Sequence, residues 1–109
     1  MSEAALYVLQ RMSAKILAPL VLLHLAIIMY ASHDGLTAGE ILQRTQGSVG
    51  WGLAYGLFVV AAAVHAPIGL RNVIREWTDW RGKGLDVAML AFGVMLLTLG
   101  LRAVWAVVG

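Results

Sequence analysis

Three ionisable side chains, His24, His65 and Arg102, lie within long apolar runs of a 109-residue chain that has no cysteine. The absence of cysteine excludes disulfides, thiolate metal sites and iron–sulfur ligation by this chain. Metal or redox chemistry here would therefore depend on imidazole or on a bound organic cofactor. Ionisable groups inside apolar helices are costly and characteristically face a bundle interior, a cavity or a ligand. These three residues are accordingly the first candidates for a functional site.

His65 stands near the end of the second apolar run, in the stretch HAPIGLRNVIREW. One interpretation is a neutral imidazole that is hydrogen-bonded to a neighbouring carbonyl. The other is axial ligation of haem iron, which needs a neutral imidazole in an apolar bundle and a second ligand opposite it. No H-E-x-x-H motif is present and one histidine cannot form a bis-imidazole site, so a haem would need a histidine from another subunit. The residue pattern leaves both interpretations open.

The positions of His24 and His65 predict different depths in a membrane. If Ser13 and Leu70 mark the inner ends of their runs, a rise of ~1.5 Å per residue puts His24 ~16 Å deep and His65 ~8 Å deep. This difference of ~8 Å predicts that the two histidines do not ligate the same iron. An interhelical hydrogen bond is the alternative role for His24, and Arg102 is alternatively expected to extend its guanidinium toward the outer surface.

The composition predicts a membrane protein rather than a soluble domain. Hydrophobic residues make up 61% of the chain, charged residues 13%, and the mean hydropathy is +0.81, which is far more apolar than ordinary soluble domains. Three membrane spans and their connections would use nearly every residue, which leaves too little chain for a soluble enzyme with its own substrate cleft. The net charge of +2 comes from few charges in total and does not indicate a nucleic-acid surface. Chemistry must therefore be shared with a cofactor or with partner subunits.

Three apolar runs are long enough to cross a hydrocarbon core of roughly 30 Å as helices. They run from about Met12 to Ala31, from Val49 to Leu70 and from Val87 to Val108. Period-2 alternation is absent, so we predict an all-α integral membrane fold with three transmembrane helices, in one domain packed within a multi-subunit helix bundle. The N-terminal residues lack the pattern of a cleavable signal peptide, so the first run is predicted to remain as an anchor.

The distribution of basic residues predicts the orientation in the membrane. Two basic residues lie at the start of the first run, Arg11 and Lys15. Four more lie between the second and third runs: Arg71, Arg75, Arg81 and Lys83. The loop of residues 32–48 offers Arg44 alone. By the positive-inside rule, the N-terminus and the second loop face the cytoplasm, which predicts a multi-pass protein of the cell inner (cytoplasmic) membrane.

The connections and small residues carry weaker signals. A Thr-x-x-Glu capping box at the start of residues 37–44 predicts either a short amphipathic helix at the outer surface or a simple connector, and we favour the connector. Gly52 and Gly56 form a G-x-x-x-G motif, continued by Ala63, which predicts close approach of another helix. Pro67 and Gly69 predict that the second helix can bend and that a bulky group can lie close to it.

Two stretches of the chain resemble the membrane-anchor subunits of succinate dehydrogenase and fumarate reductase. HAPIGLRNVIREW is similar to that family's second-helix signature, in which an acidic and an aromatic residue follow the histidine by eleven and twelve positions. YVLQRMSA is similar to the family's N-terminal Ser-x-x-His-Arg-x-Ser-Gly box. The matching positions are His65, Gly69, Leu70, Arg71, Glu76, Trp77, Arg11 and Ser13, and the departures from the N-terminal box are Tyr7, Gln10 and Ala14. Three spans in a chain of this length fit the family's small anchors.

The resemblance implies a cytochrome b subunit of a succinate:quinone oxidoreductase. In that family, two small anchors or one fused subunit lie beneath an iron–sulfur subunit and a flavoprotein, electrons pass between succinate and quinone, and the anchor performs no dicarboxylate chemistry. By position, the resemblance implies that His65 is an axial ligand of haem b and that Arg11 lies near the quinone headgroup or a haem propionate. The other residues with implied quinone- or propionate-binding roles are Tyr7, Ser13, Glu76 and Trp77.

Some members of that family bind two haems, one nearer each face of the membrane. The resemblance therefore makes His24 a candidate ligand of an outer haem, with Arg102 near its propionates and Arg71 near those of the inner haem. The alternative function is a small structural or accessory subunit of another membrane complex, in which the histidines only pack helices. A small transporter is disfavoured because the spans hold no paired acidic groups or broken helices.

Overall fold

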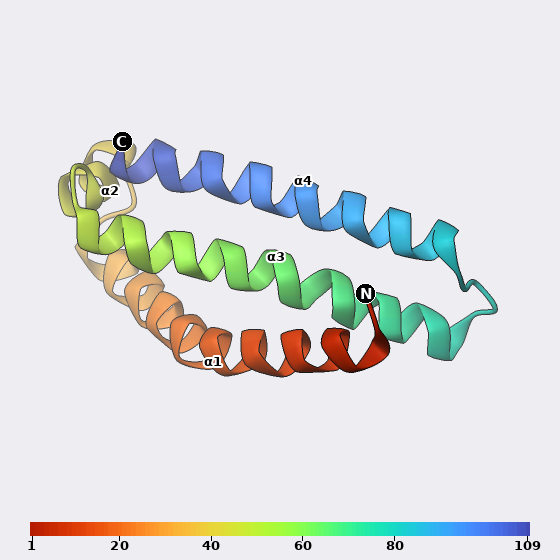
Figure 1. The fold of residues 1–109 in the computed structure, drawn as a ribbon. Helices are drawn as coiled ribbons and strands as arrows, with labels where there is room; N and C mark the ends of the chain where they lie inside the picture. Colours follow the sequence, from red (N-terminus) through yellow and green to blue (C-terminus); the bar gives the residue numbers. More distant parts are fainter.

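The computed structural model describes all 109 residues of the chain, which form four helices joined by short connections (Figure 1). They are α1 (Glu3–Asp34), α2 (Ala38–Thr45), α3 (Val49–Trp77) and α4 (Lys83–Val108). The helices α1, α3 and α4 are long and apolar enough to cross a membrane, and no strand is present. The predicted all-α architecture with three membrane-spanning helices is confirmed.

The long helices extend beyond the apolar runs that predicted them. α1 begins at Glu3 rather than near Met12, and α3 continues past Leu70 to Trp77. The 32 residues of α1 rise ~48 Å, against a hydrocarbon thickness of ~30 Å, so its polar ends project into the headgroup region. Hydropathy marks where the hydrocarbon ends, whereas a helix continues until its backbone is capped. The hydroxyl of Ser2 provides that cap for α1 by accepting a hydrogen bond from the amide of residue 5 at 3.1 Å.

The three long helices are arranged with α3 in the middle. α3 packs against both α1 and α4, whereas α1 and α4 scarcely contact each other (Figure 1). The N-terminal end of α1 and the α3–α4 connection lie toward one end of the bundle, and α2 and the C-terminus lie at the other (Figure 1). Under the predicted orientation, the former end is the inner one.

Very little of the molecule is buried within the chain itself. Only 7 of the 109 residues are buried, and Leu85 is the one large side chain that is fully enclosed. Large apolar side chains on all three long helices are exposed. An exposed apolar surface of this extent must be covered by lipid or by other subunits.

The closest approach between helices occurs where glycines of α4 meet α3. A Cβ built on Gly93 would lie 3.2 Å from the carbonyl oxygen of Ala63 and 3.2 Å from Cγ of Pro67. A Cβ built on Gly100 would lie 2.5 Å from Cγ1 of Val59. The absence of side chains at Gly93 and Gly100 therefore allows the two backbones to come together.

Within this chain, the predicted close approach of a helix occurs at Ala63, which continues the motif, and not at the two glycines of the G-x-x-x-G itself. No atom lies within 4 Å of a Cβ built on Gly56, and one on Gly52 would make an ordinary contact of 3.6 Å with Val108. The physical reason is that α4 supplies the glycines of this interface, Gly93 and Gly100, and α3 packs Pro67 and Val59 against them. α3 continues through Pro67, whose ring is buried against α4.

The outer connection contains the helix α2, so the favoured simple connector is wrong. Thr37 caps α2 as predicted, by accepting from the amide of Glu40, while the Glu40 carboxylate accepts from the Thr37 hydroxyl rather than from its amide. At the other end of α2, the hydroxyl of Thr45 donates to the carbonyl oxygen of Val107 at 2.6 Å, and the amide of Gly47 donates to that of Val108 at 2.8 Å. The last carbonyl groups of a helix have no partner within it. α2 and the residues after it satisfy these groups for α4.

Candidate functional site

His65 lies on the face of α3 that packs against α1. Its Nδ1 atom is 3.3 Å from the main-chain carbonyl oxygen of Gln10 and 3.4 Å from Oγ of Ser13. Ser13 is buried, with 5% of its surface exposed, and His65 is half-buried. Gln10 and Ser13 are about one helical turn apart on α1, so a single turn of α1 contacts the imidazole.

The two oxygen atoms near Nδ1 decide which ring nitrogen of His65 carries the proton. The hydroxyl of Ser13 has one hydrogen, which it donates to the carbonyl oxygen of Gln10 at 3.0 Å. Both oxygens therefore act as acceptors toward His65, which assigns a proton to Nδ1; in a neutral imidazole this tautomer leaves the lone pair on Nε2.

The Nε2 atom of His65 is accessible from outside the chain. It has no hydrogen-bond partner within the chain, and every buried side-chain nitrogen or oxygen atom does have one. Nε2 consequently reaches the surface of the molecule. A ring whose Nδ1 proton is held by a carbonyl and whose Nε2 is free is the usual arrangement of a metal-binding histidine.

Asn72 belongs to the same cluster and was not among the predicted site residues. Its Nδ2 atom donates to Oε1 of Gln10 at 3.0 Å, so the residue that provides the main-chain acceptor for His65 is also held through its side chain. Gly69 lies between His65 and Asn72 in sequence, and a Cβ built there would be 3.6 Å from Nε2 of Gln10. The available sequence signal for Asn72 was its position seven residues after His65, which returns to the same face of a helix.

Tyr7 and Arg11 form an exposed pair on another side of α1. The guanidinium carbon of Arg11 lies 5.7 Å from the centre of the Tyr7 ring, and neither side chain has a hydrogen-bond partner in the chain. Ser13 was predicted to act beside them. Two residues apart on a helix, Arg11 and Ser13 point in nearly opposite directions, and Ser13 is engaged by Gln10 and His65.

Glu76 and Trp77 lie in the last turn of α3 and are exposed. Glu76 is eleven residues from His65, which is about three helical turns, so it lies on the same face of α3. Trp77, with 82% of its surface exposed, points ~100° further around the helix. Glu76 forms no ion pair with Arg11 or with any other residue of the chain.

Arg71 is committed to ion pairs that join the inner ends of all three long helices. Its guanidinium is 2.8 Å from a carboxylate oxygen of Glu3 on α1 and 2.8 Å from one of Asp86 on α4, and its side chain is 12% exposed. Arg75 also pairs with Glu3, at 3.1 Å. Glu3 precedes the membrane-spanning part of α1, and the hydrogen bond from Arg71 holds the pKa of its carboxyl below the usual value. Arg71 was expected near a haem propionate, but its charge is already balanced within the chain because α1 starts early enough to bring Glu3 beside it.

His24 lies at a different level from His65. Its ring meets Tyr55 and Phe58 edge-on, with centroids 6.2 and 5.2 Å away, and it makes none of the expected hydrogen bonds within the chain. Ser13 is level with His65 instead of marking the inner end of the span. Eleven residues of α1 therefore separate the two levels by ~16 Å, twice the ~8 Å that the sequence predicted, and the two histidines cannot ligate the same iron.

Arg102 points away from His24. A cavity of about 340 Å³ lies beside His24, and the residues of α4 that line it are Gly100, Ala103, Val104 and Val107. Arg102 is not among them, is exposed and has no ion pair. The structure therefore does not bring Arg102 and His24 to one site.

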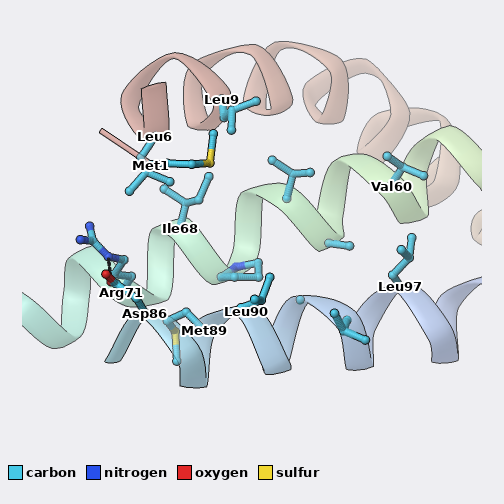
Figure 2. Close-up of a pocket in the computed structure, with 15 residues that line it drawn as sticks. Met1, Leu6, Leu9, Val60, Ile68, Arg71, Asp86, Met89, Leu90 and Leu97 are labelled. Atoms are coloured by element: carbon cyan, nitrogen blue, oxygen red, sulfur yellow. Dashed lines mark hydrogen bonds and ion pairs between the residues drawn. The ribbon is translucent and has the colours of Figure 1, made fainter. Parts of the chain in front are cut away.

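A groove of about 460 Å³ lies between α1, α3 and α4 (Figure 2). Its apolar walls include Leu6 and Leu9 of α1 and Leu90 of α4, and Arg71 and Asp86 close one end (Figure 2). No predicted histidine lines this groove, and of the other predicted site residues it includes Arg71 alone. The groove exists because α1 and α4 both pack on α3 without packing on each other.

Fold and site together define a class of protein. The chain is a small three-span membrane subunit in which His65 presents a free Nε2 atom, and it contains no group of three or more side chains that could hold a metal ion alone. A metal bound at His65 would need a ligand from elsewhere.

Comparison with known families identifies the chain more closely. Residues 2–101 match the family of the succinate dehydrogenase/fumarate reductase transmembrane subunit, and the chain belongs to this family. It is a multi-pass membrane-anchor subunit and part of a succinate:quinone oxidoreductase complex. Comparisons with curated proteins and with solved structures find no match.

Proposed function

We propose that this anchor subunit binds haem b through Nε2 of His65, together with a second anchor subunit that supplies the opposite axial ligand. The observation that carries the proposal is the hydrogen bonding of Nδ1 to Gln10 and Ser13, which in a neutral ring keeps the Nε2 lone pair free for a metal. The apolar surroundings also fit haem, whose axial histidine characteristically donates its other ring N–H to a carbonyl or carboxylate. Haem supplies reversible one-electron storage when bound.

The quinone site of the proposed complex lies at the inner membrane surface, beside Arg11 and Tyr7, with Glu76 and Trp77 contributed by α3. Quinone reduction takes up two electrons and two protons, so the pocket must hold an apolar tail in lipid and offer donors to the carbonyl oxygens. The guanidinium of Arg11, the phenol of Tyr7 and the indole N–H of Trp77 are exposed donors without partners in the chain. Ser13 acts on the haem side instead, because it is buried against His65.

The proposed partners at the inner surface are the iron–sulfur subunit and, beyond it, the flavoprotein. Arg81 and Lys83 support docking there, because both are exposed in or beside the α3–α4 connection and neither forms an ion pair within the chain. Basic residues at this end support its proposed position on the cytoplasmic side of the cell inner membrane.

His24 is the candidate ligand of a second, outer haem. Its exposed ring has no hydrogen-bond partner in the chain and borders a cavity, and its level is ~16 Å from that of His65. Such a haem would take its second ligand from the partner anchor. Arg102 of this chain would not hold its propionates, because Arg102 does not line the cavity beside His24.

The absorbance spectrum of the purified complex tests the haem proposal. The reduced complex is expected to show a b-type α-band that is lost in His65→Ala, with all subunits still present. His33→Ala is the matched control, because His33 is exposed at the outer end of α1, and it should leave the band unchanged. A colourless wild-type complex with full subunit content would refute the proposal and favour a structural or accessory role.

A further inference from the structure

We propose that Asn72 is a positioning residue that acts through Gln10 to hold His65 in the tautomer that ligates haem. The proposal rests on the haem-binding function proposed above. Nδ2 of Asn72 donates to the side-chain oxygen of Gln10 at 3.0 Å, and the main-chain oxygen of Gln10 accepts from Nδ1 of His65 at 3.3 Å. Asn72 and His65 lie on α3 and Gln10 lies on α1, so this amide bridge ties the two helices together at the level of the imidazole.

The amide bridge matters because apolar packing alone does not define how α1 is rotated against α3. Lipid tails are as apolar as the side chains, so turning α1 about its axis exchanges one apolar contact for another. A hydrogen bond between two amides is directional and is satisfied in one rotation and register. Rotation of α1 by one residue, ~100°, would carry both acceptors, the Gln10 carbonyl and Ser13 Oγ, away from Nδ1.

Placement of these acceptors affects the iron as well as the ring. Donation of the Nδ1 proton makes Nε2 a more basic ligand, and hydrogen bonding to the axial ligand is one of the means by which a protein adjusts a haem. A more basic ligand favours ferric over ferrous iron and therefore lowers the midpoint potential. A residue that only packs α1 against α3 would affect assembly without this change in potential.

The test compares Asn72→Leu and Gln10→Leu in the purified complex. Each is expected to raise the midpoint potential of the haem and to weaken haem retention by roughly 10- to 100-fold, measured as transfer to an excess of a haem-scavenging protein. The double variant should behave like either single variant, because all three lack the same hydrogen bond. Gln43→Leu is the control, since Gln43 is an exposed amide of α2 without a hydrogen-bond partner, and it should change neither quantity.

Each alternative result has a distinct meaning. Haem that is retained at the wild-type potential in both single variants would overturn the positioning role and leave the haem proposal intact. A wild-type complex without haem would instead overturn the haem proposal itself. Failure of both variants to assemble would count against the positioning role, because it would make the amide bridge a packing element.

Discussion

Replacing Gly100 with alanine should force α3 and α4 apart, because even a methyl group has no room there. A Cβ on Gly100 would lie 2.5 Å from Cγ1 of Val59, 3.0 Å from Cγ2 and 3.3 Å from Cβ. Rotation of the valine cannot relieve the contact with its Cβ, and β-branched residues in helices have essentially one rotamer. The helices must therefore shift to accept the substitution.

The expected loss of stability follows from comparison with a glycine that faces open space. Overpacking of this kind destabilises by about 1–3 kcal/mol, while Gly→Ala within a helix also contributes about 0.5–1 kcal/mol of stability through reduced backbone freedom. Gly56→Ala carries the same backbone gain but meets no atom within 4 Å. The difference between the two variants isolates the clash, so Gly100→Ala should be less stable than Gly56→Ala by about 1–3 kcal/mol.

Unfolding of the full chain in detergent micelles by titration with sodium dodecyl sulfate measures this difference. Gly56→Ala should unfold at or above the wild-type midpoint and Gly100→Ala well below it. Gly93→Ala should fall between them, because its nearest contacts are 3.2 Å. Equal midpoints for Gly100→Ala and Gly56→Ala would refute the register of α3 against α4 described above.

The remaining expectations concern charged and imidazole groups. Arg11→Ala should lower quinone reduction by roughly 10- to 100-fold, the effect of losing a charged donor, and should leave dye-coupled succinate oxidation intact. Lys15→Ala is the control and should leave both activities intact. Equal losses of the two activities in Arg11→Ala would argue against a quinone role. His24→Ala should halve the haem-to-complex ratio, and an unchanged ratio would make His24 a packing residue. Arg71→Met should lower the unfolding midpoint at low salt more than at high salt, because the carboxylates that Arg71 pairs with are exposed and salt therefore screens the pairs. Arg81→Met removes no ion pair within the chain and should not lower the midpoint in this salt-dependent way. A loss of stability in Arg71→Met that does not depend on salt would contradict the ion-pair explanation.

The spans could be predicted because hydrocarbon imposes a length of apolar chain that few other structures require. Their ends could not, since Glu3 and Trp77 lie in helices that continue beyond the hydrocarbon. His65 was recognisable as a polar group in an apolar run, and the resemblance to a known family directed attention to its imidazole. The capping box before α2 was visible, but its value to the fold depends on carbonyl groups at the distant end of α4.

The sequence by itself determined the class of fold, and it predicts the direction of the chain across the membrane and marks His65 as a candidate ligand. Tertiary structure alone decided that Nδ1 of His65 is occupied, that Asn72 joins the cluster, that Arg71 is already paired, and that Gly100 rather than Gly56 is the close contact. The physical reason is that apolar residues cover every side of these helices. Hydrophobic periodicity therefore does not reveal which side faces a neighbour, and rotation and register are set by a few hydrogen bonds, ion pairs and glycine contacts that join distant parts of the chain.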